Sequence, residues 1–291
     1  MDNSRKPDFP VVSILITTKN EEKNIGNCLR SIKSQDTENL ELIVVDNFSD
    51  DKTLHIAEEF GAKTFLKGPE RSRQRNYGAQ MAKGKYLLYL DADMILDSHL
   101  VGECLEKCEE DGFDALYIPE HIVGKGFWIK VRDFERSFYT GTVIDAVRFV
   151  RREIFLQLEG FDETLVGPED WDFDRKIRTI GKVGLADTCL LHNEGYFDMK
   201  RYLKKKGYYS DGVRKYVDKW GQNDPETKRQ TGMRYRLLGV YVEGGKWKRL
   251  VRHPLLTIAM YYLRLRVAVR YVRIRNSPCL FSNNRMVKNL N

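Results

Sequence analysis

Residues 87–96 read LLYLDADMIL, an apolar run that two carboxylates interrupt. Removing carboxylates from water costs free energy unless they are paired or bind a cation. Two oxygen ligands one residue apart suit a hard divalent ion such as Mg²⁺ or Mn²⁺, which keeps several waters and also takes phosphate oxygens. A turn at the end of a strand also favours Asp. Asp91 and Asp93 alone therefore leave both a turn and a metal site open.

The elements that precede this pair alternate in type. Short apolar runs typical of buried parallel strands occupy residues 11–16, 42–45, 64–66 and 86–90, and helical patterns occupy residues 21–32, 52–60 and 71–82. This order predicts βαβ units, and hence a parallel sheet with helices on both faces. Ligands bind at the carboxyl ends of the strands in such sheets. We therefore expect the chemistry in TTKNEE, DNFSDD and DAD, which follow three of these strands.

The DNFSDD stretch begins with an acid that is hard to explain as a helix cap. Asp and Ser often cap helices, which accounts for residues 49–51 as well as a ligand role does. Asp46 comes too early for a cap. It is better placed to accept a hydrogen bond from a bound ring.

The cysteine content and the N-terminal sequence indicate a cytoplasmic protein. A chain of 291 residues can bury a sizeable core, as one large domain or as one domain with an appendage. Its five cysteines are odd in number and include no Cys-x-x-Cys pair, and no secretory apolar region is evident at the N-terminus. We therefore expect a reducing compartment. Cys104 and Cys108 are expected in the core.

The net charge of +7 hides an asymmetry, because Lys and Arg greatly outnumber Asp and Glu from Lys200 onward. Such a basic region can serve nucleic acid or an anionic membrane. Residues 254–263 form an uninterrupted apolar stretch that is too short to span a bilayer. From Arg264 on, arginines alternate with apolar residues, which predicts an amphipathic helix in a membrane interface. Packing on the catalytic domain or on a second subunit is the alternative.

Four ordered motifs point to one family. They read VSILITTKNEEKNIGNCLRSI, ELIVVDNFSDDKT, RSRQRNYGAQMAKGKYLLYLDADM and EGFDETLVGPEDWDFDRKIRTIGKVG. Together they resemble glycosyltransferase family 2 over roughly residues 11–192. The resemblance implies the GT-A fold, a Rossmann-like three-layer α/β/α sandwich with a mostly parallel central sheet. It also implies a catalytic domain over residues 1–199, with a nucleotide-sugar half at about 11–97 and an acceptor half at 98–199. A basic helical region would follow at 200–291.

The resemblance also assigns the donor site, for a nucleoside-diphosphate sugar with UDP expected first and GDP as the alternative. The matching positions for the nucleotide are Thr17, Lys19, Glu21, Asp46, Asn47, Arg71, Arg75 and Asp91. Arg75 could equally be a structural helix residue. Asp93 and Asp91 match the ligands of Mn²⁺ or Mg²⁺, and His192 is a further candidate ligand, with a packed or capping histidine as its alternative.

The catalytic assignment rests on GPEDWDF. Acids at the start of a helix are stabilised by its dipole whatever their function. The resemblance assigns Asp170 as the general base that takes the proton of an acceptor hydroxyl, with inversion at the anomeric carbon, and Glu169 as a residue that positions the acceptor or the loop. Trp171 could stack on a sugar or belong to the core.

Three functions remain open at this point. The first is transfer to a hydroxyl of a glycan or lipid-linked acceptor, by a peripheral protein on the cytoplasmic face of the membrane. The second is a polyprenyl-phosphate sugar synthase, whose anionic acceptor needs no base. The third is a basic scaffold without activity. A nucleotidyltransferase is disfavoured because TTKNEEKNIG is not a Gly-rich phosphate loop. Nucleic acid is not expected as a partner, and homo-oligomers stay open.

Overall fold

The computed structural model describes residues 10–275, with side chains as far as Tyr271. The contacts divide the chain into two compact units. The first comprises Met1–Pro119, Ala146–Glu163 and Asp172–Leu191, and the second comprises Glu120–Asp145, Thr164–Trp171 and His192–Asn291. This division differs from the predicted boundary at residue 199, because segments on the N-terminal side of that boundary belong to the second unit.

The first unit is built on a seven-stranded sheet with the order β3-β2-β1-β4-β8-β6-β9. Its strands are β1 (Val12–Thr18), β2 (Leu40–Asp46), β3 (Lys63–Leu66), β4 (Tyr86–Asp91), β6 (Ala115–Tyr117), β8 (Val147–Arg151) and β9 (Val183–Leu185). Only β8 is antiparallel to its neighbours among these pairs. A second sheet has the order β5-β10-β7, formed by β5 (Met94–Leu96), β10 (Leu190–Tyr196) and β7 (Glu120–Lys125). The seven-stranded sheet is therefore mostly parallel, as predicted.

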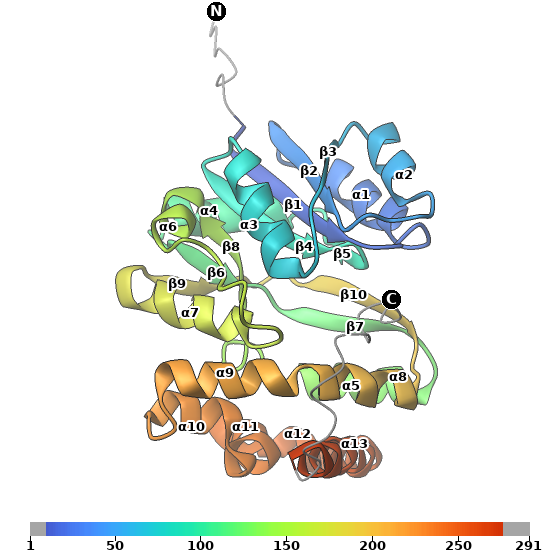
Figure 1. Cartoon of the computed structure of the whole chain (residues 1–291), viewed down its shortest axis with the longest axis vertical. Helices are drawn as coiled ribbons and strands as arrows, with labels where there is room; N and C mark the ends of the chain where they lie inside the picture. Colours follow the sequence, from blue (N-terminus) through green and yellow to red (C-terminus); the bar gives the residue numbers. More distant parts are fainter. Residues whose placement is uncertain (1–9, 276–291) are drawn as a thin grey trace, which may run out of the picture. The chain divides into compact units, whose positions relative to one another are not determined.

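Alternation along β1 gives the first unit its three layers (Figure 1). Ile14 and Ile16 pack in one apolar cluster with α1 (Ile25–Lys33), α2 (Thr53–Glu59) and α4 (Leu100–Glu109). Leu15 packs in the other, with α3 (Arg71–Met81), α6 (Arg152–Gln157) and α7 (Glu169–Ile180). Side chains of successive strand residues point to opposite faces, so both faces of the sheet are covered. The predicted α/β/α sandwich is confirmed, and Cys104 and Cys108 lie in its first core cluster.

The second unit is largely helical. Its helices are α5 (Phe127–Arg136), α8 (Met199–Tyr208), α9 (Ser210–Trp220), α10 (Pro225–Thr231), a π-helix η1 (Tyr235–Gly239), α11 (Val240–Val242), a 3₁₀ turn η2 (Glu243–Gly245), α12 (Trp247–Arg252) and α13 (Pro254–Arg275). Val131 and Phe138 pack with Tyr241, Met260 and Leu263 in one core. The stretch that holds α5 therefore belongs with the C-terminal helices, because they bury its apolar face. In the part of the chain that the structure describes, no helix is both long and apolar enough to cross a membrane.

A buried ion cluster ties α13 to α5. The Glu135 carboxylate accepts hydrogen bonds from Arg132 at 2.6 Å, from the Tyr139 hydroxyl at 2.7 Å and from Arg264 at 3.2 Å. Burial alone would raise the pKa of Glu135, but the charges of Arg132 and Arg264 outweigh burial and lower this pKa from 4.5 to about 2. The carboxylate is therefore charged in the folded protein over the whole physiological range.

Replacing Glu135 by Gln should lower the free energy of unfolding by about 3–5 kcal/mol, because the buried Arg264 loses its carboxylate partner and Arg132 is left with Glu194. The Asp211→Asn variant is the control, since Asp211 is an exposed partner of Arg214 at 2.9 Å and its loss should cost less than about 1 kcal/mol. Urea unfolding at pH 7 measures both.

The pH dependence of folding stability provides a second test of the role of Glu135. Its folded pKa lies below the ordinary value, so its contribution is complete above about pH 4.5 and is lost as pH falls toward 2. The gap in stability between wild type and Glu135→Gln should therefore close over that range. An equal loss in the Gln and Asn variants at pH 7 would contradict the structural role of Glu135.

Candidate active site

Three neighbouring strands end in register at one edge of the sheet in the first unit. Thr17 in β1 lies opposite Asp91 at the end of β4, and Thr18 lies opposite Asp46 at the end of β2. The parallel pairing therefore brings together residues that are up to 74 positions apart. This is the edge at which the sequence predicts chemistry.

Asp91 has cationic partners within the protein. Its carboxylate accepts a hydrogen bond from Thr17 Oγ1 at 3.2 Å and forms ion pairs with Arg71 at 3.2 Å and Arg75 at 3.1 Å. The guanidinium of Arg75 is 1% exposed and lies 5.2 Å from the centre of the Tyr89 ring. Arg75 is therefore a buried helix residue that pairs with Asp91, and its contact with a nucleotide stays a prediction.

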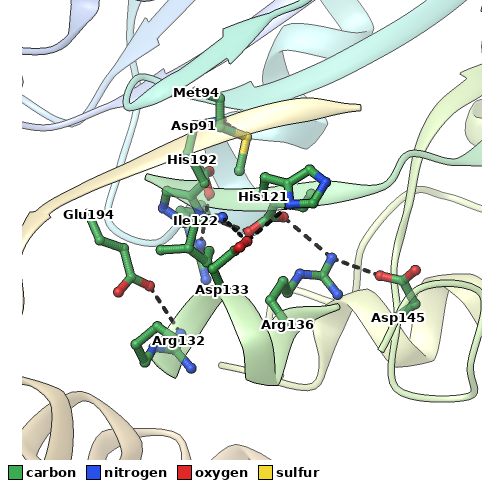
Figure 2. Close-up of polar contacts among 12 residues, drawn as sticks. Asp91, Met94, His121, Ile122, Arg132, Asp133, Arg136, Asp145, His192 and Glu194 are labelled. Atoms are coloured by element: carbon green, nitrogen blue, oxygen red, sulfur yellow. Dashed lines mark hydrogen bonds and ion pairs between the residues drawn. The ribbon is translucent and has the colours of Figure 1, made fainter. Parts of the chain in front are cut away.

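Asp93 lies on the turn that joins β4 to β5. The same turn brings the Asp91 backbone N–H within 3.5 Å of Met94 Sδ (Figure 2). Burial, followed by the negative charges of Asp93 and Asp91, raises the pKa of the Cys28 thiol. Both carboxylates therefore lie near enough to this buried thiol to disfavour its ionisation.

The donor set at this turn suits a hard cation only with help from other ligands. Among the described residues, no group of three or more His, Cys, Asp or Glu side chains could hold a metal ion. Mg²⁺ is commonly bound by one or two carboxylates together with waters and phosphate oxygens. Asp93 and Asp91 therefore fit the predicted ion when a diphosphate is present, and their ligand role stays a prediction.

The DNFSDD loop is held by the acid that begins it. Asp46 is fully buried, and it accepts hydrogen bonds from the backbone N–H of Ser49 at 2.6 Å and from the Ser49 hydroxyl at 2.5 Å. Lys19 Nζ donates to the Phe48 carbonyl at 2.5 Å. Asp46 and Lys19 therefore shape the loop, and their contact with a nucleotide stays a prediction.

Two other predicted donor residues also contact chain segments around this loop. The Glu21 N–H donates to Thr53 Oγ1 at 2.8 Å, and the Glu21 carboxylate accepts from Asn24 at 2.7 Å, which orders the start of α1. Asn47 packs against Gly68 so closely that a Cβ at Gly68 would lie 1.9 Å from Asn47 Oδ1. A side chain at position 68 would therefore displace the Asn47 side chain.

An exposed aromatic residue at this edge was missed by the sequence analysis. Phe48 is 59% exposed and has a positive φ of 56°, a conformation that bulky residues rarely adopt. The hydrogen bond from Lys19 to its carbonyl helps to hold it in this conformation. The sequence signal that could have revealed Phe48 is an aromatic residue within the acidic DNFSDD stretch. Its exposed ring suits stacking on a planar ligand.

The start of α7 belongs to the second unit. Glu169 is buried and accepts a hydrogen bond from the Gly167 N–H at 2.5 Å, so it shapes the loop before the helix. Asp170 is partly exposed. The Trp171 indole donates to the Ile144 carbonyl at 3.3 Å, and its ring packs edge-on to Tyr216. Trp171 therefore lies against the core, which favours the structural alternative for this residue.

His192 is oriented by a carboxylate in the second unit (Figure 2). Its Nδ1 lies 2.8 Å from an oxygen of Glu120, and Arg136 bridges from Glu120 at 3.4 Å to Asp145 at 2.9 Å. A carboxylate that fixes the tautomer of a histidine is common behind metal ligands. No local sequence pattern indicates this network, because its members are far apart along the chain. The ligand role of His192 stays a prediction.

Comparison with known proteins identifies the first unit's motifs. Residues 13–156 match the sequence model of the family described as Glycosyl transferase family 2. The chain contains a glycosyltransferase family 2 domain. An uncharacterized glycosyltransferase of Rickettsia typhi is 26% identical over 72% of this chain and 69% of its own length. The poly(ribitol-phosphate) beta-N-acetylglucosaminyltransferase TarS of Staphylococcus aureus is 31% identical over 68% of this chain but only 35% of its own length. The predicted family and enzyme class, glycosyl transfer, are confirmed.

Solved structures give the same fold. TarS residues 1–349 in complex with UDP align with a TM-score of 0.56 and 18% identity, over 90% of this chain and 89% of that chain. The mannosyltransferase PcManGT of Pyrobaculum calidifontis, in complex with GDP-Man and Mn²⁺, aligns with a TM-score of 0.61 and 18% identity, over 91% of this chain and 87% of that chain. The predicted GT-A fold is therefore confirmed.

Replacing Arg75 by Lys should destabilise the first unit by about 2 kcal/mol, because an ammonium cannot reproduce the planar, stacked contact of the guanidinium beside Asp91. The Arg73→Lys variant on the same helix is the control, since Arg73 is 45% exposed and pairs with Glu163 at 3.0 Å. Chemical unfolding should show little change for the control. Equal effects in both variants would mean that Arg75 does not position Asp91.

Proposed function

We propose that the protein is a metal-dependent, inverting glycosyltransferase that moves a sugar from a nucleoside-diphosphate sugar to a hydroxyl group of a glycan or lipid-linked saccharide. The observation that carries the proposal is the register of β1, β2 and β4, which aligns Thr17 with Asp91 and Thr18 with Asp46 in a family 2 domain. Strand ends of a parallel sheet are where such folds bind their ligands. No observation favours the polyprenyl-phosphate synthase or the scaffold.

The proposed donor is a UDP-sugar, with a GDP-sugar as the second choice. The solved structure of TarS 1–349 in complex with UDP-GlcNAc supports the first, and that of PcManGT with GDP-Man supports the second. Phe48 would stack on the base, because its exposed ring is held beside the DNFSDD acids. Arg71, on α3, would reach a phosphate from its place beside Asp91.

Asp93 and Asp91 would hold Mn²⁺ or Mg²⁺ together with waters and phosphate oxygens of the donor. His192 is a separate candidate ligand, and Glu120 fixes its ring by its contact with Nδ1. When bound, such an ion stabilises negative charge on a leaving nucleoside diphosphate as a Lewis acid. The protein's own part is to keep two carboxylates on one turn, with Arg71 and Arg75 offsetting part of their mutual repulsion.

Asp170 would take the proton of the acceptor hydroxyl as that oxygen attacks the anomeric carbon. A single displacement of this kind inverts the anomeric centre. Its neighbour Glu169 would serve as a positioning residue, since its hydrogen bond to the Gly167 N–H fixes the loop that leads into α7. Product NMR should therefore show an anomeric configuration opposite to that of the donor.

Isothermal titration with UDP and GDP, each with Mn²⁺ or Mg²⁺ and again with EDTA, tests the donor site. One nucleotide should bind only when metal is present, and the Asp93→Ala variant should lose this binding because it lacks a ligand. The Asp111→Ala variant, altered at an exposed acid of the first unit, should bind as wild type does. In the same titration, Phe48→Ala should bind about tenfold more weakly and keep the metal dependence. Equal binding with and without EDTA would contradict the metal.

Replacing Asp170 by Asn should lower the rate of transfer by about 10²–10⁴-fold, because the proton has no acceptor, while nucleotide affinity stays unchanged. The Asp211→Asn variant, at an exposed acid of α9, is the matched control and should keep the full rate. Loss of transfer and of nucleotide binding together would refute the role of general base.

A further inference from the structure

An apolar stripe runs along α12 and α13 on the side that the core does not cover. Its residues follow one another at intervals of three, four or seven: Trp247, Val251, Leu255, Ile258, Leu265 and Val269. All are large and exposed, with Leu255 at 74% and Ile258 at 69%. This spacing places the side chains within each helix along one side of it. Large apolar residues gathered in this way mark an interaction surface.

The opposite side of α13 packs against the core of the second unit. Ala259, Met260, Leu263 and Val267 are buried, the first three within the core of the second unit. Arg264 on this side is also buried and pairs with Glu135 at 3.2 Å. The helix is therefore apolar on both sides, and packing within the chain accounts for only one of them.

The charges around the stripe are all of one sign. Residues 247–275 contain no Asp or Glu, and the exposed basic residues among them include Lys248, Arg252, Arg266 and Arg270. A second copy of this chain that packed its stripe on the first would bring these like charges together, which costs free energy. The partner that fits is anionic and apolar at once.

A groove between α8 and α13 adds further basic and aliphatic residues to this surface. Its volume is about 300 Å³, and it is lined by Lys200, Leu203, Lys204, Arg266, Val269 and Arg270. Four of the six residues are cationic and two are aliphatic. Arg266 also bonds to the Tyr262 hydroxyl at 2.9 Å, which fixes its side chain on the exposed side of α13. Such a lining suits a phosphate group attached to an apolar chain.

We propose that α12, α13 and the α8–α13 groove form a docking surface for an anionic lipid bilayer. The apolar stripe enters the boundary between head groups and acyl chains, and the groove receives a lipid phosphate. Helices that expose both apolar and basic residues bind membranes through the sum of buried apolar area and attraction to anionic lipids. The interaction is peripheral, and it does not depend on the identity of the sugar donor or on the catalytic residues.

Co-sedimentation of the full chain with vesicles tests the proposal. One set of vesicles is phosphatidylcholine alone, and in the other about a third of the lipid is phosphatidylglycerol. The protein should bind the second set much more tightly, and added salt should weaken that binding. Inorganic phosphate at the same ionic strength should not compete more than chloride does, because the ligand is the bilayer. Stronger competition by phosphate would instead assign the groove to a soluble anion.

Paired variants separate the two components of the surface. The double variant Ile258→Gln with Leu265→Gln should bind anionic vesicles at least about tenfold more weakly, and Lys200→Gln with Arg270→Gln about 30-fold more weakly. The matched controls are Ile180→Gln with Leu156→Gln, at exposed apolar positions of the first unit, and Arg214→Gln with Lys215→Gln on α9. The controls should bind as wild type does. Circular dichroism and thermal unfolding should show that all variants are folded.

Three outcomes would overturn the proposal. The first is equal binding to neutral and anionic vesicles, and the second is no binding to either. The third is a dimer in sedimentation velocity that dissociates in the Ile258→Gln with Leu265→Gln variant, which would assign the stripe to a second copy of the chain.

Discussion

The first unit is organised around a carboxylate at the end of a buried strand that must be neutralised. Asp91 ends β4, whose other residues are buried, and its charge is balanced by Arg71 and Arg75. Both arginines come from α3, so this helix must lie across the strand ends. Gln74 between them donates to the carbonyls of Thr18 at 3.0 Å and Val45 at 2.6 Å, which fixes α3 to two more strands. The site is thus shaped by the cost of burying charge.

Much of the first unit could be predicted because its signals are local. Apolar runs of strand length and helical patterns between them located β1 to β4 and α1 to α3 within a few residues. The exception is the start of α1, which begins at Ile25 because Glu21 and Asn24 form a turn in which the Asn24 N–H bonds to the Glu21 carbonyl at 3.0 Å. The strand-end acids could be located too, since each acidic stretch directly follows or interrupts an apolar run.

The second unit was harder to predict because its decisive contacts are long-range. Glu120 meets His192 across 72 positions, and Glu135 meets Arg264 across 129. No pattern within a window of sequence reports such pairs. Helix α13 shows the same limit, since it is apolar on both sides, and only the packing of Met260 and Leu263 in the core distinguishes its covered side from its exposed side.

The path of the chain has a consequence for how such a protein could arise. The polypeptide passes between the two units five times, after Pro119, Asp145, Glu163, Trp171 and Leu191. Two of these passages lie inside α7 and β10, within continuous secondary structure. A gene fragment that stopped before α8 would encode α5 without the helices that cover Val131 and Phe138. Separating the C-terminal helices from the sheet would therefore require cuts within α7 and β10, and it would uncover the apolar face of α5.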